Sequence, residues 1–288
     1  MEISNQFQQN PLAMFMRQPK IFIRLPSNGE YWPNGSLEIS STGDYPVYSM
    51  TAQDELMLKI PDALMNGQAI VEVIQHCIPN IKNAWDVPST DIDVILIAIR
   101  LATYGEKMTT PITFGEIEMD YVIDLRTVMD TLLNQITWDP IVSINDDLTV
   151  FVRPINYKQM SYTALQSFET QKIIQMANNE QITDTDKIAM FKESFTKLTN
   201  VTIGMVAESI FKIDSSKGST DNIKFIQEFI NNSDKSVFDK IQNHLEKLKE
   251  QNSIKPIIVS VTDEMRQNGI TGDTVEIPMT FDASTFFV

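Results

Sequence analysis

Cysteine and histidine are the side chains in this sequence best suited to nucleophilic or general-base chemistry, and the chain has one cysteine and two histidines. Cys77 directly follows His76, and adjacent residues of a helix point about 100° apart, so the two cannot form a Cys–His dyad. His244 lies in a strongly charged segment, where we expect it to face water. A zinc site would need both histidines to converge with a carboxylate, which nothing in their spacing indicates. We therefore predict no catalytic residue, no metal site and no cofactor.

Carboxylates are the other groups that could do chemistry, because a glycosidase uses two of them across a cleft. The sequence has 38 acidic residues, so close pairs arise by chance. We interpret one such pair, Asp91 and Asp93, as partners of the positive end of a buried helix. A cell-wall hydrolase that uses an Asp/Glu pair stays open as the alternative function. The sequence contains no phosphate-binding loop, dinucleotide fingerprint, nucleophile elbow or calcium loop.

The composition is that of an acidic globular protein. Of 288 residues, 42% are hydrophobic and 21% charged, and 23 basic against 38 acidic side chains give a net charge of −15. Such a surface repels nucleic acid and anionic lipid and suits a basic partner. One cysteine excludes an intrachain disulfide and fits a reducing cytoplasm. The N-terminus lacks a signal-peptide pattern, and the most apolar run, 94–102, is too short to span a membrane. We predict neither a nucleic-acid nor a membrane partner.

The first part of the chain is predicted to form a loose arm and then small antiparallel hairpins. Residues 1–19 are rich in Gln and Asn and are interrupted by proline, as in a flexible arm. Residues 20–25 alternate as in a β-strand. Two Asn-Gly pairs follow as turn signals, and residues 37–40 and 45–49 are predicted to pair as a second hairpin.

Buried helices are predicted for the centre of the chain. Thr51 can cap a helix, and residues 68–77 carry an apolar helical face. The next helix, capped by Ser89 or Thr90, is apolar nearly all round and must therefore be buried. Alternation then predicts a strand over 112–125. A short helix and a hairpin complete this part, over 126–136 and 141–152.

The C-terminal part is predicted to be a series of helices that ends in extended chain. The second of these helices is capped by Thr183, and its apolar positions from Ile188 to Ile210 recur at helical spacing, which predicts a buried face. Residues 215–219 are predicted to be a linker. The other helices cover 158–178, 221–230 and 237–251, and the predicted strands cover 256–260 and 275–280.

These elements define an α+β fold that is predominantly helical. It would have small antiparallel N-terminal hairpins, central buried helices, a C-terminal helical hairpin region and a short terminal β ribbon. We divide the chain into a flexible arm, a mixed α/β domain, a helical region, and a β ribbon with an aromatic tail. The bounds of these four parts are 1–19, 20–156, 157–252 and 253–288.

Aromatic side chains without obvious cover are the best candidates for contacts with a partner. Tyr31 and Trp32 lie in a turn between the two Asn-Gly pairs, and Phe281, Phe286 and Phe287 lie at the end of the chain. Such aromatic residues dock either on their own chain or on a partner. We predict all five as partner-binding residues.

Several segments carry a resemblance to one family. Residues 49–108, which contain DELMLKIPDALMNG followed by PSTDIDVILIAIRLATYG, are similar to the core of the baseplate hub assembly family of T-even-like contractile-tailed bacteriophages. The similarity continues through VRPINYKQM and QSFETQKI, through residues 190–199 and the segment FIQEFINNSDKSVFDKIQNHLEKLKEQNSIKP, to the ending EIPMTFDASTFF. It covers the chain from about Lys20 to the C-terminus.

The resemblance implies a phage tail protein, without enzymatic activity, that helps to build the central baseplate hub as a hub component or an assembly chaperone. Its partners would be other hub proteins, and it would work in the host cytoplasm during assembly. Self-association as a homo-oligomer and retention in the tail baseplate of the virion stay open. Some relatives carry CxxC-type pairs, which this chain lacks, so the resemblance carries over no zinc site. A scaffold unrelated to phages, binding through residues 157–251, is a further alternative.

Overall fold

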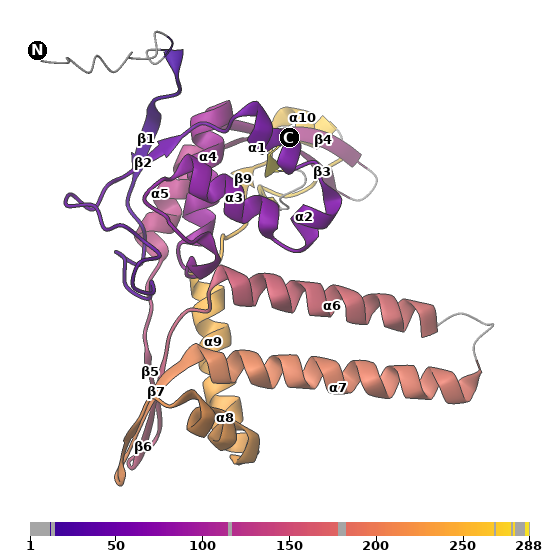
Figure 1. The fold of residues 1–288 in the computed structure, drawn as a ribbon. Helices are drawn as coiled ribbons and strands as arrows, with labels where there is room; N and C mark the ends of the chain where they lie inside the picture. The colour runs from indigo at the N-terminus through magenta and orange to yellow at the C-terminus, as the bar shows by residue number, and fades with distance from the viewer. Residues whose placement is uncertain are drawn as a thin grey trace, which may run out of the picture.

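The computed structural model describes residues 12, 15–114, 117–177, 183–267, 269–277, 279 and 286–287 (Figure 1). Over these residues the chain is a mixed α+β protein with small antiparallel sheets, which confirms the predicted fold class. Figure 1 shows an upper and a lower part joined by one long helix, and two other long helices that project to one side.

The N-terminal strands frame the upper part. β1 (Pro19–Ile23) is confirmed as a strand, and its antiparallel partner is β2 (Tyr45–Tyr48). The predicted second hairpin, with residues 37–40 as its first strand, is wrong, because Leu37 forms an isolated bridge with Ile81 instead. Pairing with β1 buries one face of β2 in the core, a gain that a short local hairpin on the surface would not have.

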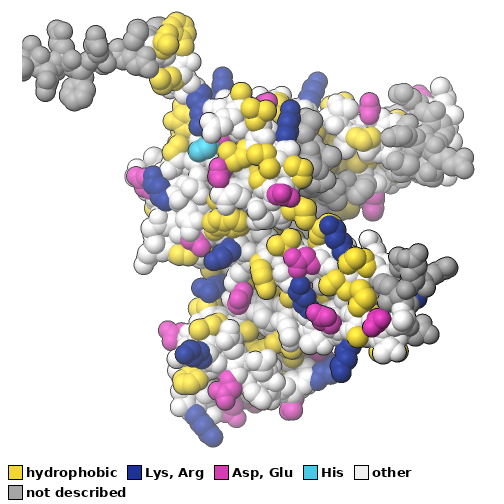
Figure 2. All heavy atoms as spheres, turned by 45° about the vertical axis from the view of Figure 1, so that its right-hand side comes forward, with side chains coloured by type: hydrophobic (Ala, Val, Ile, Leu, Met, Phe, Trp, Pro, Cys, Tyr) yellow, Lys and Arg dark blue, Asp and Glu magenta, His cyan; other side chains and the backbone are white. Residues whose placement is uncertain are grey.

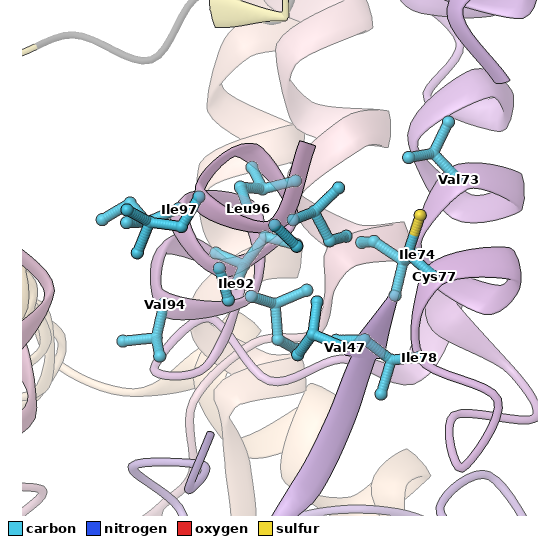
Figure 3. Packing of buried hydrophobic residues seen from close by; sticks show 14 of the residues in the cluster. Val47, Val73, Ile74, Cys77, Ile78, Ile92, Val94, Leu96 and Ile97 are labelled. Atoms are coloured by element: carbon cyan, nitrogen blue, oxygen red, sulfur yellow. The ribbon is translucent and has the colours of Figure 1, made fainter. Parts of the chain in front are cut away.

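Short helices and one long buried helix form the centre of the upper part. Thr51 caps the first helix, as predicted, in a capping box with Asp54. The long helix, α4, is buried along most of its length, as its all-round apolar sequence predicted. Figure 3 shows Val47, Ile74 and Ile92 meeting in this core. The helices are α1 (Ala52–Met57), α2 (Pro61–Met65), α3 (Gln68–Cys77), the 3₁₀ helix η2 (Ala84–Asp86) and α4 (Ile92–Tyr104).

Two hairpins stack on one another at the edge of the upper part. The first pairs β3 (Lys107–Phe114) with β4 (Ile117–Asp124), where the sequence predicted a single strand over 112–125. The chain forms two paired strands here because each strand gains buried side chains, with Met108 on β3 and Ile123 on β4 in the core. Helix α5 (Leu125–Gln135) follows.

The second hairpin comes from the C-terminal part and confirms the two predicted strands. β9 (Ile257–Ser260) pairs antiparallel with β10 (Thr274–Ile277), and α10 (Asp263–Gln267) lies between them in the chain. Ile277 and Ile112 of β3 belong to the same small apolar cluster, so the C-terminal ribbon closes against β3–β4.

The lower part is built on a four-stranded antiparallel sheet in the order β5–β6–β7–β8. Its strands are β5 (Ile141–Asn145), β6 (Leu148–Val152), β7 (Ile210–Ser215) and β8 (Gly218–Thr220). The predicted linker over 215–219 is wrong, because residues 210–220 form a hairpin that extends the β5–β6 pair and buries Ile213. The helices α8 (Ile223–Asn232) and α9 (Lys235–Asn252) share an apolar cluster with this sheet.

The two projecting helices are α6 (Tyr157–Ala177) and α7 (Asp184–Ser209). They run side by side away from the rest of the molecule (Figure 1). Because β6 precedes α6 and β7 follows α7, this α6–α7 hairpin is an insertion between two neighbouring strands of one sheet. The sheet thus joins strands from both sides of residue 156, and the division of the chain into domains stays a prediction.

Candidate interaction surface

The α6–α7 hairpin has small polar side chains where its two helices meet. Thr170 and Ser194 are each 1% exposed. Thr170 Oγ1 donates to the carbonyl oxygen of Gln166 at 2.8 Å, whereas the buried Ser194 Oγ has no hydrogen-bond partner among the described residues. Small side chains let the helices approach closely, but they remove little apolar surface from water.

Large apolar side chains lie on the outer surface of the α6–α7 hairpin. On α7, Ile188 is 68% exposed and Phe195 is 63% exposed, and on α6 both Tyr162 and Met176 are exposed. Figure 2 shows hydrophobic side chains among charged ones over this part of the molecule, beside the undescribed tip. Full burial of one such side chain is worth about 1.5–3 kcal/mol, so a group of them in water indicates a surface that another protein covers.

The sequence placed these apolar positions correctly on one helix but predicted a buried face. Ile188 and Phe195 are seven residues apart, which puts them on the same side of α7. Ser194 is the residue that faces α6, and Phe195 is rotated from it by about 100°. The seven-residue spacing was therefore the available signal for an interface.

A groove of about 250 Å³ lies between the two helices. It is lined by Tyr162 and Gln166 of α6 and by Asn200 and Gly204 of α7, among others. Ligand pockets usually have volumes of about 300–1,000 Å³, so this groove suits a side chain of a partner better than a cofactor.

Trp32 and Tyr31, two of the predicted contact residues, lie near the start of α4. Trp32 Nε1 donates to Asp91 Oδ2 at 2.9 Å, and Ser27 donates to the same carboxylate from its backbone N–H (2.8 Å) and its Oγ (2.5 Å). The Tyr31 ring lies 6.4 Å from the ring of Trp138, and its backbone has a φ of 67°. Both aromatic residues are partly exposed, and their role in partner binding stays a prediction.

Phe286 and Phe287 lie in the core of the same chain, with 2% and 3% of their surface exposed. Arg100 of α4 donates a hydrogen bond to the carbonyl oxygen of Phe286, and the Tyr104 hydroxyl donates to that of Phe287 at 2.9 Å. The Arg100 guanidinium also lies 5.3 Å from the centroid of the Phe286 ring. Phe281 lies outside the described residues, and a partner-binding role for the three phenylalanines stays a prediction.

The candidate catalytic groups are held in structural contacts. His76 Nδ1 lies 2.7 Å from Asp54 Oδ1. Burial raises the pKa of Asp54, but hydrogen bonds from Thr51 and His76 outweigh it and hold that pKa below its ordinary value. The buried Cys77 thiol has its pKa raised to about 12 by burial, so it carries no thiolate at neutral pH.

The two carboxylates at the start of α4 are shifted in the direction that burial imposes. Burial raises the pKa of Asp91, against the hydrogen bonds that it accepts, and raises the pKa of Asp93 to about 6. Neither residue lines the α6–α7 groove or the shallow groove beside α8. Within the described ranges, no group of three or more His, Cys, Asp or Glu side chains could hold a metal ion.

The fold and this surface define a mixed α+β protein that carries a helical hairpin, with exposed apolar side chains, inserted into a sheet. None of the helices in the described part combines the length and hydrophobicity that a membrane span requires. Residues 19–260 match the family described as T4 bacteriophage base plate protein, and the chain belongs to that family. Searches of curated proteins and of solved structures found no match.

Proposed function

We propose that this chain is a non-enzymatic protein of the central baseplate hub, either a hub component or an assembly chaperone, that acts through contacts with other hub proteins. Membership of the base plate family supports a place in the tail, and the exposed apolar side chains of the α6–α7 hairpin support a role in protein contacts. The observation that carries the proposal is the exposure of Ile188 and Phe195 on a hairpin that projects from the body.

The surrounding chemistry agrees with this function. The net charge of −15 favours basic surfaces on a partner, and the buried thiol of Cys77 suits assembly in the reducing host cytoplasm. In this proposal Tyr31 and Trp32 add a second contact region on the upper part.

Co-expression with the other hub proteins of the same phage tests the proposal. The chain should co-purify in a complex of defined stoichiometry, and Phe195→Glu should reduce the yield of that complex at least tenfold. Phe22→Glu is the matched control, because Phe22 is 64% exposed on β1, far from the hairpin in the fold. The proposal fails if no hub protein binds, or if the purified chain clears peptidoglycan and a single Asp or Glu substitution abolishes that activity.

A further inference from the structure

One helix of the α6–α7 hairpin carries a narrow apolar stripe. Ile188, Phe191, Phe195 and Leu198 follow one another at intervals of three, four and three residues, which is the spacing of core positions in a coiled coil. Ile188 and Phe195 are largely exposed, and the other two are partly exposed. We call these four residues the α7 stripe.

The α7 stripe lies beside the face that α7 uses against α6. Taking Ser194 as the direction of α6, all four stripe residues lie between about 40° and 120° to one side of it by helical geometry. The α6–α7 groove lies on the other side, since it is lined by Lys197, Asn200 and Gly204. The stripe can therefore seat a further helix without displacing α6.

The charge of the hairpin indicates what that further helix is. Helices α6 and α7 have five lysines and five acidic residues in their sequences, 5 − 5 = 0, and Glu180 between them brings the hairpin to −1, whereas the whole chain carries −15. A neutral apolar stripe gives a basic partner no electrostatic advantage. Two copies of this acidic chain repel each other over most of their surface, whereas two neutral stripes can meet without that repulsion.

We infer that the α7 stripe pairs with the α7 stripe of a second copy of this chain, so that two hairpins form an antiparallel four-helix bundle with two-fold symmetry. The inference rests on the proposed function only in its use of the α6–α7 hairpin as a contact surface, and it names a second copy of the chain as the occupant of the α7 stripe. The stripe lies in the half of α7 that is farther from the lower sheet, because α7 enters that sheet directly after Ser209.

The antiparallel direction follows from where the charge lies. From residue 193, the middle of the stripe, to Ser209 is about 24 Å of helix, so antiparallel pairing places the two sheets about 48 Å apart along the bundle. That distance is several Debye lengths at physiological salt, about 8 Å each, so the acidic bodies repel little. Parallel pairing would put them side by side.

Sedimentation of the purified full chain over a concentration series tests the inference. A stripe of four residues is short, so we expect a dimer with a dissociation constant in roughly the micromolar range. Phe195→Glu should weaken the dimer at least tenfold, and Phe225→Glu should leave it unchanged, because Phe225 is 60% exposed but lies on α8. Far-ultraviolet circular dichroism confirms that both variants fold.

Disulfide trapping tests the direction of pairing. Antiparallel stripes bring residue 188 of one copy opposite residue 198 of the other, so the double variant Ile188→Cys, Leu198→Cys should crosslink into dimers while each single variant should not. The buried Cys77, with a thiol pKa of about 12, should not react. Crosslinking of the single variants would overturn the antiparallel arrangement.

The two proposals fail in different ways. A full-length chain that stays monomeric at about 0.1 mM, or a dimer that survives Phe195→Glu, overturns the second-copy inference. If that monomer still binds a hub protein through Phe195, the proposed function stands. A stripe-dependent dimer that binds no hub protein supports the inference and overturns the proposed function.

Discussion

The two carboxylates at the start of α4, the buried Asp91 and the half-buried Asp93, both have raised pKa values, but only Asp91 accepts hydrogen bonds from Ser27 and Trp32. Burial raises the pKa of Asp93 from 3.8 to about 6, so the folded state disfavours its charged form. The folded chain therefore binds more protons than the unfolded chain between these values, and stability falls as pH rises from about 4 to about 6. Above about pH 6 the charged Asp93 lowers the free energy of unfolding by its full amount.

Asp93→Asn removes this charge. We expect the variant to be more stable than the wild type by about 1–3 kcal/mol at pH 7 and to gain nothing at pH 3.5, measured by urea unfolding at both values. Asp91→Asn is the control, because it replaces an acceptor of bonds from Ser27 and Trp32 and should destabilise the fold by about 1–3 kcal/mol. An equal gain in stability for Asp93→Asn at both pH values would contradict the raised pKa of Asp93.

The C-terminal phenylalanines are expected to stabilise the upper part. Phe286→Ala should lower the free energy of unfolding by about 3–5 kcal/mol, because the ring is 2% exposed and packs in the main core. Phe22→Ala, in which the ring is 64% exposed, should change it by less than about 0.5 kcal/mol. Thermal unfolding of the two variants side by side measures the difference, and similar values would show that the tail does not dock as the structure describes.

At the scale of elements, the packing between α6 and α7 contributes little stability around the buried Ser194. Ser194→Ala should raise the stability of the hairpin by roughly 1 kcal/mol, because it removes a buried hydroxyl without a partner and improves helix propensity. Ser209→Ala is the matched control on the same helix, since Ser209 Oγ donates to the Met205 carbonyl oxygen at 2.9 Å and its loss should bring no gain. Hydrogen exchange of the α6 and α7 amides reads out the local effect, and no extra protection in Ser194→Ala would contradict it.

Elements that depend on local signals were predictable from the sequence. Thr51 marked the start of α1, and the continuous apolar pattern of α4 predicted its burial. Strand partners were not predictable in the same way, because β2 pairs with β1 and β7 with β6 through contacts far apart in the chain.

The interaction surface was predictable only in part. Helical spacing located Ile188 and Phe195, but spacing alone does not reveal whether an apolar face has a partner in its own chain. Trp32 and Phe286 show the opposite case, because these aromatic residues have partners within the chain. Those partners, Asp91 and Arg100, lie far away in sequence, so the sequence alone did not reveal them.

At the scale of the whole molecule, the base of the α6–α7 hairpin belongs to the scaffold, because Met160 packs against the main core and Val206 and Ala207 are buried in the lower cluster, whereas the outer part projects from it. The Arg153 N–H donates to the Ser209 carbonyl oxygen at 2.7 Å, and Val152 of β6 pairs with Ile210 of β7, so the two ends of the insertion are neighbours. Replacing residues 164–200, which leaves Met160, Val206 and Ala207 in their apolar clusters, with a short Gly/Ser linker should therefore leave a folded protein, as judged by a cooperative unfolding transition. This protein should not dimerise and should bind hub proteins at least tenfold more weakly. Loss of cooperative unfolding would show instead that the outer part of the hairpin is also part of the scaffold.

Salt dependence separates self-association from binding to a basic partner, because the two respond in opposite directions. Screening reduces repulsion between two chains of charge −15, so the dimer should tighten as salt rises. With the acidic bodies held apart at opposite ends of the bundle, we expect the gain between 0.1 and 0.5 M salt to be less than about threefold. Binding of a basic hub protein through the second contact region, around Tyr31 and Trp32, should weaken over the same range, since it depends on attraction to the acidic chain that salt screens. Sedimentation at four salt concentrations measures the dimer, and co-purification yield at the same concentrations measures hub binding. A dimer that weakens with salt would mean that charged contacts, not the neutral α7 stripe, hold the two copies together.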